Sequence, residues 1–230
     1  MTARSAPTRT AATRTAAPRP TVLLTGFDAF GGASLNPSWL AVQALQGRQV
    51  LGHRVVAAQL PTVFGASLKT LDALLAEHRP ALVICVGQAG GRSAISLERV
   101  AINVDDAPID DNAGARPVDA PVYPGAPAAY FTGLPVKAMH AALQQAGIKV
   151  EVSQTAGTFV CNHVFYGLMH ALATRRALRR TRGGFVHVPW LPEQGTPALA
   201  LDAIVRGLRV AVHCALQVSR DEVRGAGATH

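Results

Sequence analysis

Short apolar runs alternate with segments of helical spacing along most of the chain. Strand-like runs, typical of strands buried inside a sheet, cover residues 21–25, 54–59, 81–86, 97–104, 148–153 and 185–188. Helical patterns start at Asn36-Pro37, span 68–79 and 134–145, follow residue 158 and start again at Thr196-Pro197. Asn36 is expected to cap its helix, with Pro37 at the first helical position. Residues 105–130, rich in Asp, Pro and Ala, are predicted to form a long loop.

Strands separated by helices predict an α/β fold: a single three-layer α/β/α domain with a mostly parallel, twisted central sheet. No repeat or linker interrupts residues 21–218, and hydrophobic residues make up 49% of the chain, enough for a sizeable core. Residues 1–20, rich in Arg, Ala and Thr, are expected to be a disordered tail because they cannot bury a core. Residues 219–230 are expected to be a flexible C-terminal tail.

The formal net charge of +8 does not predict a nucleic-acid partner. Part of it lies in the tail, on Arg4, Arg9, Arg14 and Arg19, and no nucleic-acid-binding motif accompanies it. No apolar stretch is long enough for a membrane span or a secretory signal. The tail resembles an organellar transit peptide, but a plain disordered extension is the favoured alternative. We therefore expect no membrane association and a cytoplasmic location.

Three cysteines without a Cys-x-x-Cys pair argue against a disulfide framework or zinc site and fit a reducing compartment. Cys161 follows a Gly-containing turn at the start of a predicted helix, where backbone N–H groups and the helix dipole favour a thiolate. Cys85 lies in a strand and Cys214 on a helix face, so both are interpreted as buried apolar residues. Cys161 is the candidate nucleophile, with a buried structural cysteine as the alternative.

A catalytic cysteine needs a base, and the chain has eight histidines. His187 lies near the C-terminal end of a predicted strand, where functional groups of parallel sheets gather. It is preferred over His163, which would point to a different helix face from Cys161. The alternative for His187 is an ordinary core histidine. Glu98, flanked by apolar residues, is a candidate to orient it, although a structural Glu98–Arg99 pair and several aspartates remain open.

Two further features suggest binding sites at first sight. The aspartates of residues 105–111 lack the pattern of a calcium loop, so turn and capping roles are favoured. The glycine-rich turns 26–32 and 87–91 follow strands but match no phosphate-binding motif. Phe27 and Phe30 in the first turn suit a flat, uncharged ring better than a phosphate.

Taken together, these motifs resemble the pyroglutamyl peptidase I family, also called pyrrolidone-carboxylate peptidases. The segments that carry the resemblance are Thr25–Gly32 with Asn36–Ser38, Val86–Arg92, Glu98–Asn103, Thr155–His163 and Gly183–Pro189. Five segments in register over residues 21–217 are far more specific than any one of them. The Arg-rich tail lies outside the resemblance.

The resemblance implies a cysteine peptidase that removes an N-terminal pyroglutamyl residue from peptides through a thioester intermediate. Its catalytic triad falls on Glu98, Cys161 and His187. Its substrate-binding positions fall on Phe27, Phe30, Asn36, Gln88, Ile109, Phe159 and Val160, with less defined roles for Asn36 and Gln88. The family needs no metal or cofactor, is cytoplasmic and is commonly a homotetramer. Its partners are N-terminally pyroglutamylated peptides.

Three rival functions remain open at this point. A phosphorylase-like transferase would use the glycine-rich turns for phosphate and would tolerate loss of Cys161. A non-catalytic binding protein would retain the triad without turnover. A nucleic-acid-associated protein would bind through its tail, and its affinity would fall steeply with salt.

Overall fold

The computed structural model describes residues 20–227. The predicted N-terminal tail therefore lies outside the described residues except for Pro20, as do residues 228–230 of the predicted C-terminal tail. Within residues 20–227, no helix is long and apolar enough to cross a membrane.

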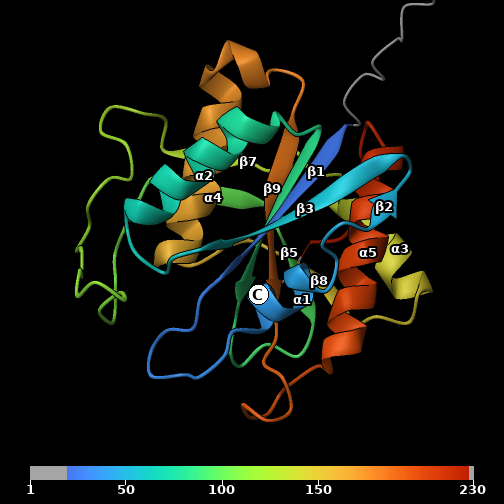
Figure 1. Ribbon diagram of the computed structural model, residues 1–230, viewed down its shortest axis with the longest axis horizontal. Coiled ribbons are helices and arrows are strands. Elements are labelled where there is room, and N and C mark those ends of the chain that lie inside the picture. Colours follow the sequence, from blue (N-terminus) through green and yellow to red (C-terminus); the bar gives the residue numbers. More distant parts are fainter. Residues whose placement is uncertain (1–19, 228–230) are drawn as a thin grey trace, which may run out of the picture.

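Seven strands form one twisted sheet in the order β2-β3-β1-β4-β9-β5-β8 (Figure 1). Their bounds are Thr21–Phe27 (β1), Gln49–Val50 (β2), His53–Leu60 (β3), Leu82–Gln88 (β4), Ile95–Glu98 (β5), Val150–Ser153 (β8) and Arg182–Val188 (β9). Strands β3, β1, β4 and β9 run parallel, whereas β5 is antiparallel to β9 and parallel to β8, and β2 is antiparallel to β3. The predicted mostly parallel sheet is confirmed.

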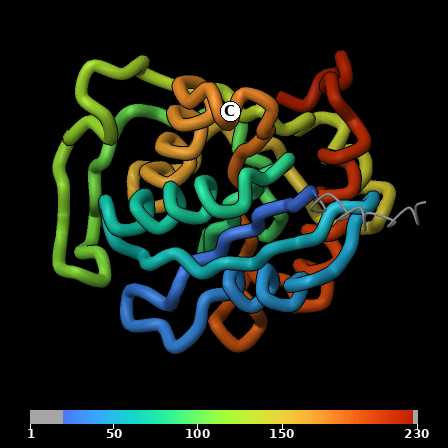
Figure 2. Tube along the Cα trace, turned by 45° about the horizontal axis from the view of Figure 1, so that its top comes forward, coloured from blue at the N-terminus to red at the C-terminus, as the bar shows by residue number. Residues whose placement is uncertain are grey.

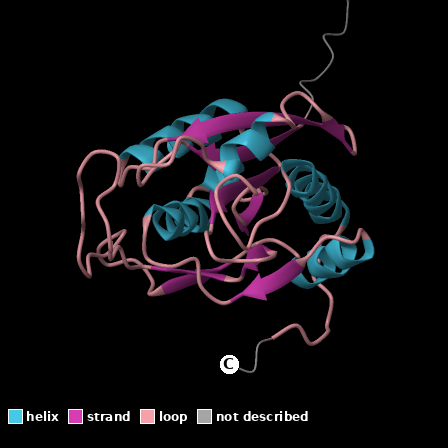
Figure 3. Ribbon diagram, turned by 90° about the horizontal axis from the view of Figure 1, so that it is seen from below, coloured by secondary structure: helices cyan, strands magenta, loops and turns pink. Residues whose placement is uncertain are grey.

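Helices cover both faces of this sheet, as the two turned views show (Figures 2 and 3). Their bounds are Pro37–Gln43 (α1), Ala66–His78 (α2), Val136–Gln145 (α3), Val160–Thr174 (α4) and Leu201–Gln217 (α5), with a short 3-10 helix at Arg176–Leu178. Helices α2 and α4 share one apolar core with the sheet, and α1, α3 and α5 share the other. The predicted three-layer α/β/α architecture is confirmed.

Local chemistry explains several element boundaries. The apolar runs of β1 and β4 are buried on both faces, which is why they lack polar alternation. Asn36 caps α1 as predicted, since its Oδ1 accepts the Ser38 N–H at 3.0 Å and Pro37 follows in the first turn. Helix α2 ends at Arg79, which adopts a left-handed conformation before Pro80.

Several predicted boundaries were wrong. The strand expected over 97–104 is two strands, because β5 ends at Glu98 in the main sheet and Val100–Ile102 (β6) pairs with Ala129–Phe131 (β7) in a separate one. The last helix begins at Leu201 rather than at Thr196-Pro197, whose cis peptide bond lies in a loop. Strand β9 begins at Arg182 and so includes Gly183 and Gly184, where a Cβ would meet the side chains of Leu172 and Leu134.

Residues 218–227, which follow α5 in the described part of the chain, contain no helix or strand, but they contact the start of α3. The Asp221 carboxylate accepts hydrogen bonds from the Lys137 and Ala138 N–H groups at the start of α3, at 3.1 and 3.0 Å. The carboxylate thus meets unpaired N–H groups and the positive end of the helix dipole.

Gly26 allows α1 to lie directly on β1. A Cβ at this position would be 2.6 Å from the Trp39 Cα and 2.7 Å from the Trp39 N, both backbone atoms. We therefore expect Gly26→Ala to push α1 away from the sheet and to lower the free energy of unfolding by about 1–3 kcal/mol. Urea unfolding at matched protein concentration measures this change. Gly225→Ala is the control, since nothing lies within 4 Å of its Cβ position; an equal effect in both variants would contradict the packing argument.

Candidate active site

Cys161 is the second residue of α4 and lies at the carboxyl end of the parallel strands. Helix α4 has no side-chain N-cap, and within residues 20–227 the N–H groups of Val160, Cys161 and Asn162 donate no hydrogen bond. Free N–H groups at a helix start can stabilise negative charge on an oxygen atom. The thiol therefore lies beside a site suited to an oxyanion.

His187 and Glu98 form a buried pair. The His187 Nδ1 lies 2.7 Å from the Glu98 Oε1, and the side chains are 5% and 0% exposed. Because the carboxylate can only accept, Nδ1 carries the proton and the Nε2 lone pair is left for other chemistry. The structure thus brings together Glu98 and His187, which were paired as carboxylate and base from the sequence.

Strand register places Cys161 beside this pair. Gly87 is the partner of His187 in the β4–β9 ladder, so their side-chain directions leave the same face of the sheet. A Cβ on Gly87 would lie 2.8 Å from the Cys161 Sγ and 2.8 Å from the Phe185 Cζ. The sulfur therefore occupies the space that a side chain at position 87 would fill, on the same face as His187.

Arg92 is the second partner of Glu98. Its Nη1 donates to the Glu98 Oε1 at 2.7 Å, and its Nη2 donates to the Thr155 carbonyl at 3.1 Å. Burial alone would raise the pKa of Glu98, but the hydrogen bond and charge of His187, with smaller effects of Ser153 and Arg92, hold the pKa below its usual value. The arginine that pairs with Glu98 is therefore Arg92, whereas the alternative considered from the sequence was Arg99.

The pKa values of the thiols, unlike that of Glu98, are raised overall by burial. Burial raises the pKa of Cys161 to about 12, with the Glu98 charge adding to the effect and Arg92 opposing it. The residue remains partly exposed, but the surrounding atoms desolvate its sulfur. Burial also raises the pKa of Cys85 to about 12 and that of Cys214. The raised pKa favours the protonated thiol at rest, whereas the position of Cys161 at a helix start had suggested a thiolate.

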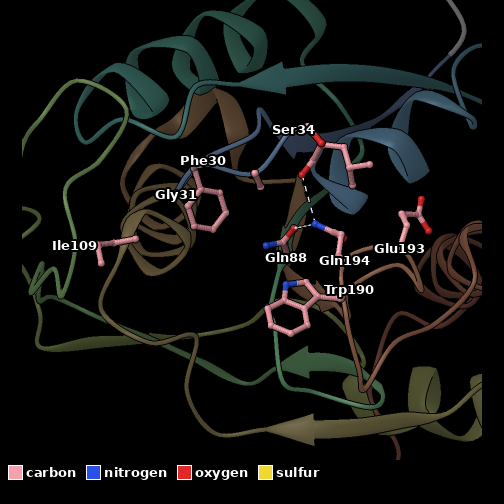
Figure 4. Close-up of a pocket in the computed structure, with 11 residues that line it drawn as sticks. Phe30, Gly31, Ser34, Gln88, Ile109, Trp190, Glu193 and Gln194 are labelled. Atoms are coloured by element: carbon pink, nitrogen blue, oxygen red, sulfur yellow. Dashed lines mark hydrogen bonds between the residues drawn. The ribbon is translucent and has the colours of Figure 1, made fainter.

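A pocket of about 620 Å³ is lined in part by Gln88, the residue that follows Gly87 (Figure 4). Three of the predicted substrate-binding residues line it: Phe30, Gln88 and Ile109. Phe159 adjoins them, since its ring centroid lies 6.0 Å from that of Phe30. The pocket thus combines aromatic and aliphatic surface with several polar side chains, those of Ser34, Gln88, Glu193 and Gln194.

The other three predicted binding residues are buried beside the pocket. Phe27 packs against Phe185 with ring centroids 6.4 Å apart, and the Val160 side chain lies in the core between α4 and the sheet. The Asn36 amide binds the Asp28 carbonyl and both polar groups of Ser38. These three side chains therefore pack or bond behind the residues near the pocket.

Comparison with known proteins agrees with these observations. A sequence model of the pyroglutamyl peptidase family matches residues 20–218. The pyrrolidone-carboxylate peptidase of Cupriavidus taiwanensis is 56% identical over 216 residues, covering 92% of this chain and 100% of that protein. Its counterpart in Bacillus cytotoxicus is 50% identical over 215 residues, covering 91% and 99%. The crystal structure of pyroglutamyl peptidase I from Bacillus amyloliquefaciens superimposes with a TM-score of 0.87 at 47% identity, covering 90% and 100%.

The chain belongs to the pyroglutamyl peptidase family. The predicted resemblance is confirmed, and with it the prediction that the chain is a hydrolase of pyroglutamyl peptides.

No role was predicted from the sequence for several residues of this candidate site. Gln194, Trp190 and Arg92 come from loops after strands, and Arg92 was noted only as the end of the segment Val86–Arg92. The indole of Trp190 packs where a Cβ of Gly90 would lie, 2.4 Å from two of its carbon atoms. The glycines of turn 87–91 therefore make room for Cys161 and Trp190, which accounts for Gly87 and Gly90 without a phosphate.

Residues next to Cys161 fix the loop that carries Ile109. The Asn162 amide bonds both backbone groups of Ile102 and the Val104 carbonyl, at 2.9–3.0 Å. His163 points away from the sulfur, as predicted, and its Nδ1 binds Asp105 at 2.8 Å while its Nε2 accepts the Gly65 N–H at 3.0 Å. Both side chains tie the start of α4 to this loop.

The aspartates of residues 105–111 have structural contacts. The Asp111 carboxylate accepts the N–H groups of Phe64, Ala113 and Ala115, as expected for a residue that organises a turn. Within residues 20–227, no group of three or more acidic, His or Cys side chains has the arrangement of a metal site.

Arg92 provides a test of the charge balance around Glu98. Arg92→Gln removes a positive charge that lowers the Glu98 pKa, so Glu98 takes up a proton at a higher pH than in the wild type. If the ionised carboxylate is needed, the acid limb of the kcat/KM profile shifts to higher pH. At neutral pH we expect a loss below about tenfold, since Arg92 is partly exposed.

Arg99→Gln is the matched control, because it removes the same charge from the residue adjacent to Glu98. Its acid limb should coincide with that of the wild type. A shift caused by Arg99→Gln but not by Arg92→Gln would restore the Glu98–Arg99 pairing.

Proposed function

We propose that the enzyme hydrolyses the bond after an N-terminal pyroglutamyl residue with Cys161 as nucleophile, His187 as general base and acid, and Glu98 as the group that orients His187. The observation that supports it best is that the Cys161 sulfur lies 2.8 Å from where a Cβ of Gly87, the ladder partner of His187, would be, while Glu98 binds the Nδ1 of His187. This order of nucleophile, base and carboxylate is the general arrangement for nucleophilic catalysis.

The raised pKa of Cys161 sets how acylation begins. Because the resting thiol is protonated, its proton passes to the His187 Nε2 as the sulfur attacks the pyroglutamyl carbonyl carbon. The carbonyl oxygen becomes an oxyanion, and the free N–H groups at the start of α4 are placed to stabilise it. The imidazolium formed on His187 is stabilised by Glu98 and donates its proton to the departing amine, which leaves a thioester.

Deacylation uses the same groups. A water molecule gives a proton to His187 Nε2 and attacks the thioester carbonyl, and collapse of the second oxyanion expels the Cys161 sulfur. The proton returns from His187 to the sulfur, and free pyroglutamate leaves. No metal or cofactor takes part in these steps.

Specificity follows from the properties of the lactam. Pyroglutamate is flat and lacks an ammonium group, so we propose that it lies among Phe30, Phe159 and Ile109, with Phe27 and Val160 supporting them. Gln88 would provide a polar contact, and Asn36 would keep the 28–36 loop in place. Ring-opened glutamate would put two charges into this surface at a large desolvation cost.

Family resemblance also supports a cytoplasmic enzyme that assembles as a homo-oligomer. We propose that this homo-oligomer is a tetramer. It supports a catalytic domain over residues 21–218, with tails at 1–20 and 219–230. Sedimentation of the full chain tests the assembly, and a monomer at micromolar concentration would contradict it.

Loss of the nucleophile tests the central claim. Cys161→Ala should reduce hydrolysis of pyroglutamyl-aminomethylcoumarin by at least about 10³-fold, because no other group can form the thioester. Cys214→Ala is the matched control, since Cys214 lies on α5 in the opposite core and should retain nearly full activity. Glutamyl and prolyl analogues should not be cleaved. Unimpaired turnover by a folded Cys161→Ala variant, or none by reduced wild type, would refute the proposal.

A further inference from the structure

Two backbone groups fix the orientation of the Gln194 side chain. The Leu191 N–H can only donate, and it lies 3.0 Å from one end of the Gln194 amide, which must therefore be Oε1. The Leu35 carbonyl can only accept, and it lies 3.5 Å from the other end, which must be Nε2. Gln194 is thus held between the loop that follows β9 and the loop that precedes α1.

Gln194 in turn fixes Gln88. Its Nε2 donates to the Gln88 Oε1 at 3.0 Å. Rotating the Gln88 amide by half a turn would place two NH₂ groups against each other, so that neither could accept. Figure 4 shows the result: the Gln88 oxygen faces Gln194, and its amide nitrogen points away from Gln194.

The surroundings of Gln88 make this nitrogen significant. Phe30, Ile109 and Trp190 line the same pocket and present mostly apolar surface. The packing of Trp190 against Gly90 keeps the indole in place. Within residues 20–227, the Gln88 Nε2 has no hydrogen-bond acceptor, so it is available to a ligand.

We propose that Gln194 is a positioning residue that makes Gln88 a hydrogen-bond donor for a carbonyl oxygen of the substrate. This inference rests on the proposed function, because it concerns recognition at the same site. Two carbonyl groups qualify: the lactam carbonyl of the pyroglutamyl ring and a peptide carbonyl beyond the scissile bond. Both carbonyl oxygens can only accept hydrogen bonds, so neither could bind Gln88 if its amide were rotated by half a turn.

Gln194→Glu is the decisive variant. One carboxylate oxygen still accepts the Leu191 N–H, and the other now faces Gln88 as an acceptor and loses the contact with the Leu35 carbonyl. Gln88 must then turn its NH₂ toward position 194 and its oxygen toward the pocket. We expect kcat/KM for the substrate that uses this contact to fall about tenfold to hundredfold, mainly through KM. Gln194→Met, which removes the contact without adding charge, should give a smaller loss in the same direction.

Three controls separate positioning from a general effect on structure. Gln43→Glu makes the same chemical change on an exposed residue of α1 and should leave kcat/KM within about twofold. In a Gln88→Met background, Gln194→Glu should cause little additional loss, because no amide remains to be turned. The rate at which iodoacetamide alkylates Cys161 should be unchanged, since this small reagent has no lactam to be recognised.

The choice of ligand distinguishes the two carbonyls. If the lactam carbonyl is bound, Gln194→Glu weakens turnover of pyroglutamyl-aminomethylcoumarin. It also weakens the protection that bound 2-pyrrolidone gives Cys161 against alkylation by iodoacetamide. If a peptide carbonyl is bound, only pyroglutamyl peptides lose activity. Unchanged kinetics with all ligands, or an equal loss with and without the Gln88 amide, would overturn the inference. Protection by 2-pyrrolidone needs no turnover, so it tests recognition even if the proposed hydrolysis fails.

Discussion

The lack of a side chain at Gly87 is the constraint on which the site depends. The Cys161 sulfur lies only 2.8 Å from where a Cβ of residue 87 would be, so the start of α4 can approach the end of β4 this closely only if that residue is glycine. The same strand pairs Gly87 with His187, and β9 pairs with β5, which ends at Glu98. One close contact between a helix and a strand therefore brings residues from three parts of the sequence into a single group.

A buried carboxylate would be unfavourable without partners, and Glu98 has two of them. His187 binds its Oε1 from β9, and Arg92 binds the same atom from the turn after β4. A buried charge with hydrogen-bonded partners stays ionised, whereas an isolated one becomes neutral. The low pKa of Glu98 is thus a property of the assembled turn and strand, and the carboxylate faces the Nδ1 of His187.

The sequence was informative wherever one local rule decided the outcome. The apolar runs predicted β1 and β4, and Asn36-Pro37 predicted the start of α1. The last helix was placed too early because Thr196-Pro197 satisfies a local start signal without packing there. Arg92, Trp190 and Gln194 could not be predicted from composition or periodicity, since their roles arise from contacts between separate loops. The expected thiolate also depended on a local rule, the helix dipole, and burial outweighs it.

In the proposed mechanism, the charges around Glu98 act directly on the chemistry. With the pKa of Cys161 raised to about 12, the nucleophile would form only as its proton moves to His187, so the rate would depend on how well the imidazolium is stabilised. That stabilisation comes from ionised Glu98, whose pKa is lowered in part by Arg92. Arg92 therefore affects the nucleophile through two intermediate groups, Glu98 and His187. Substituting Arg92 should therefore shift the acid limb of the pH profile more strongly than it lowers the rate at the optimal pH.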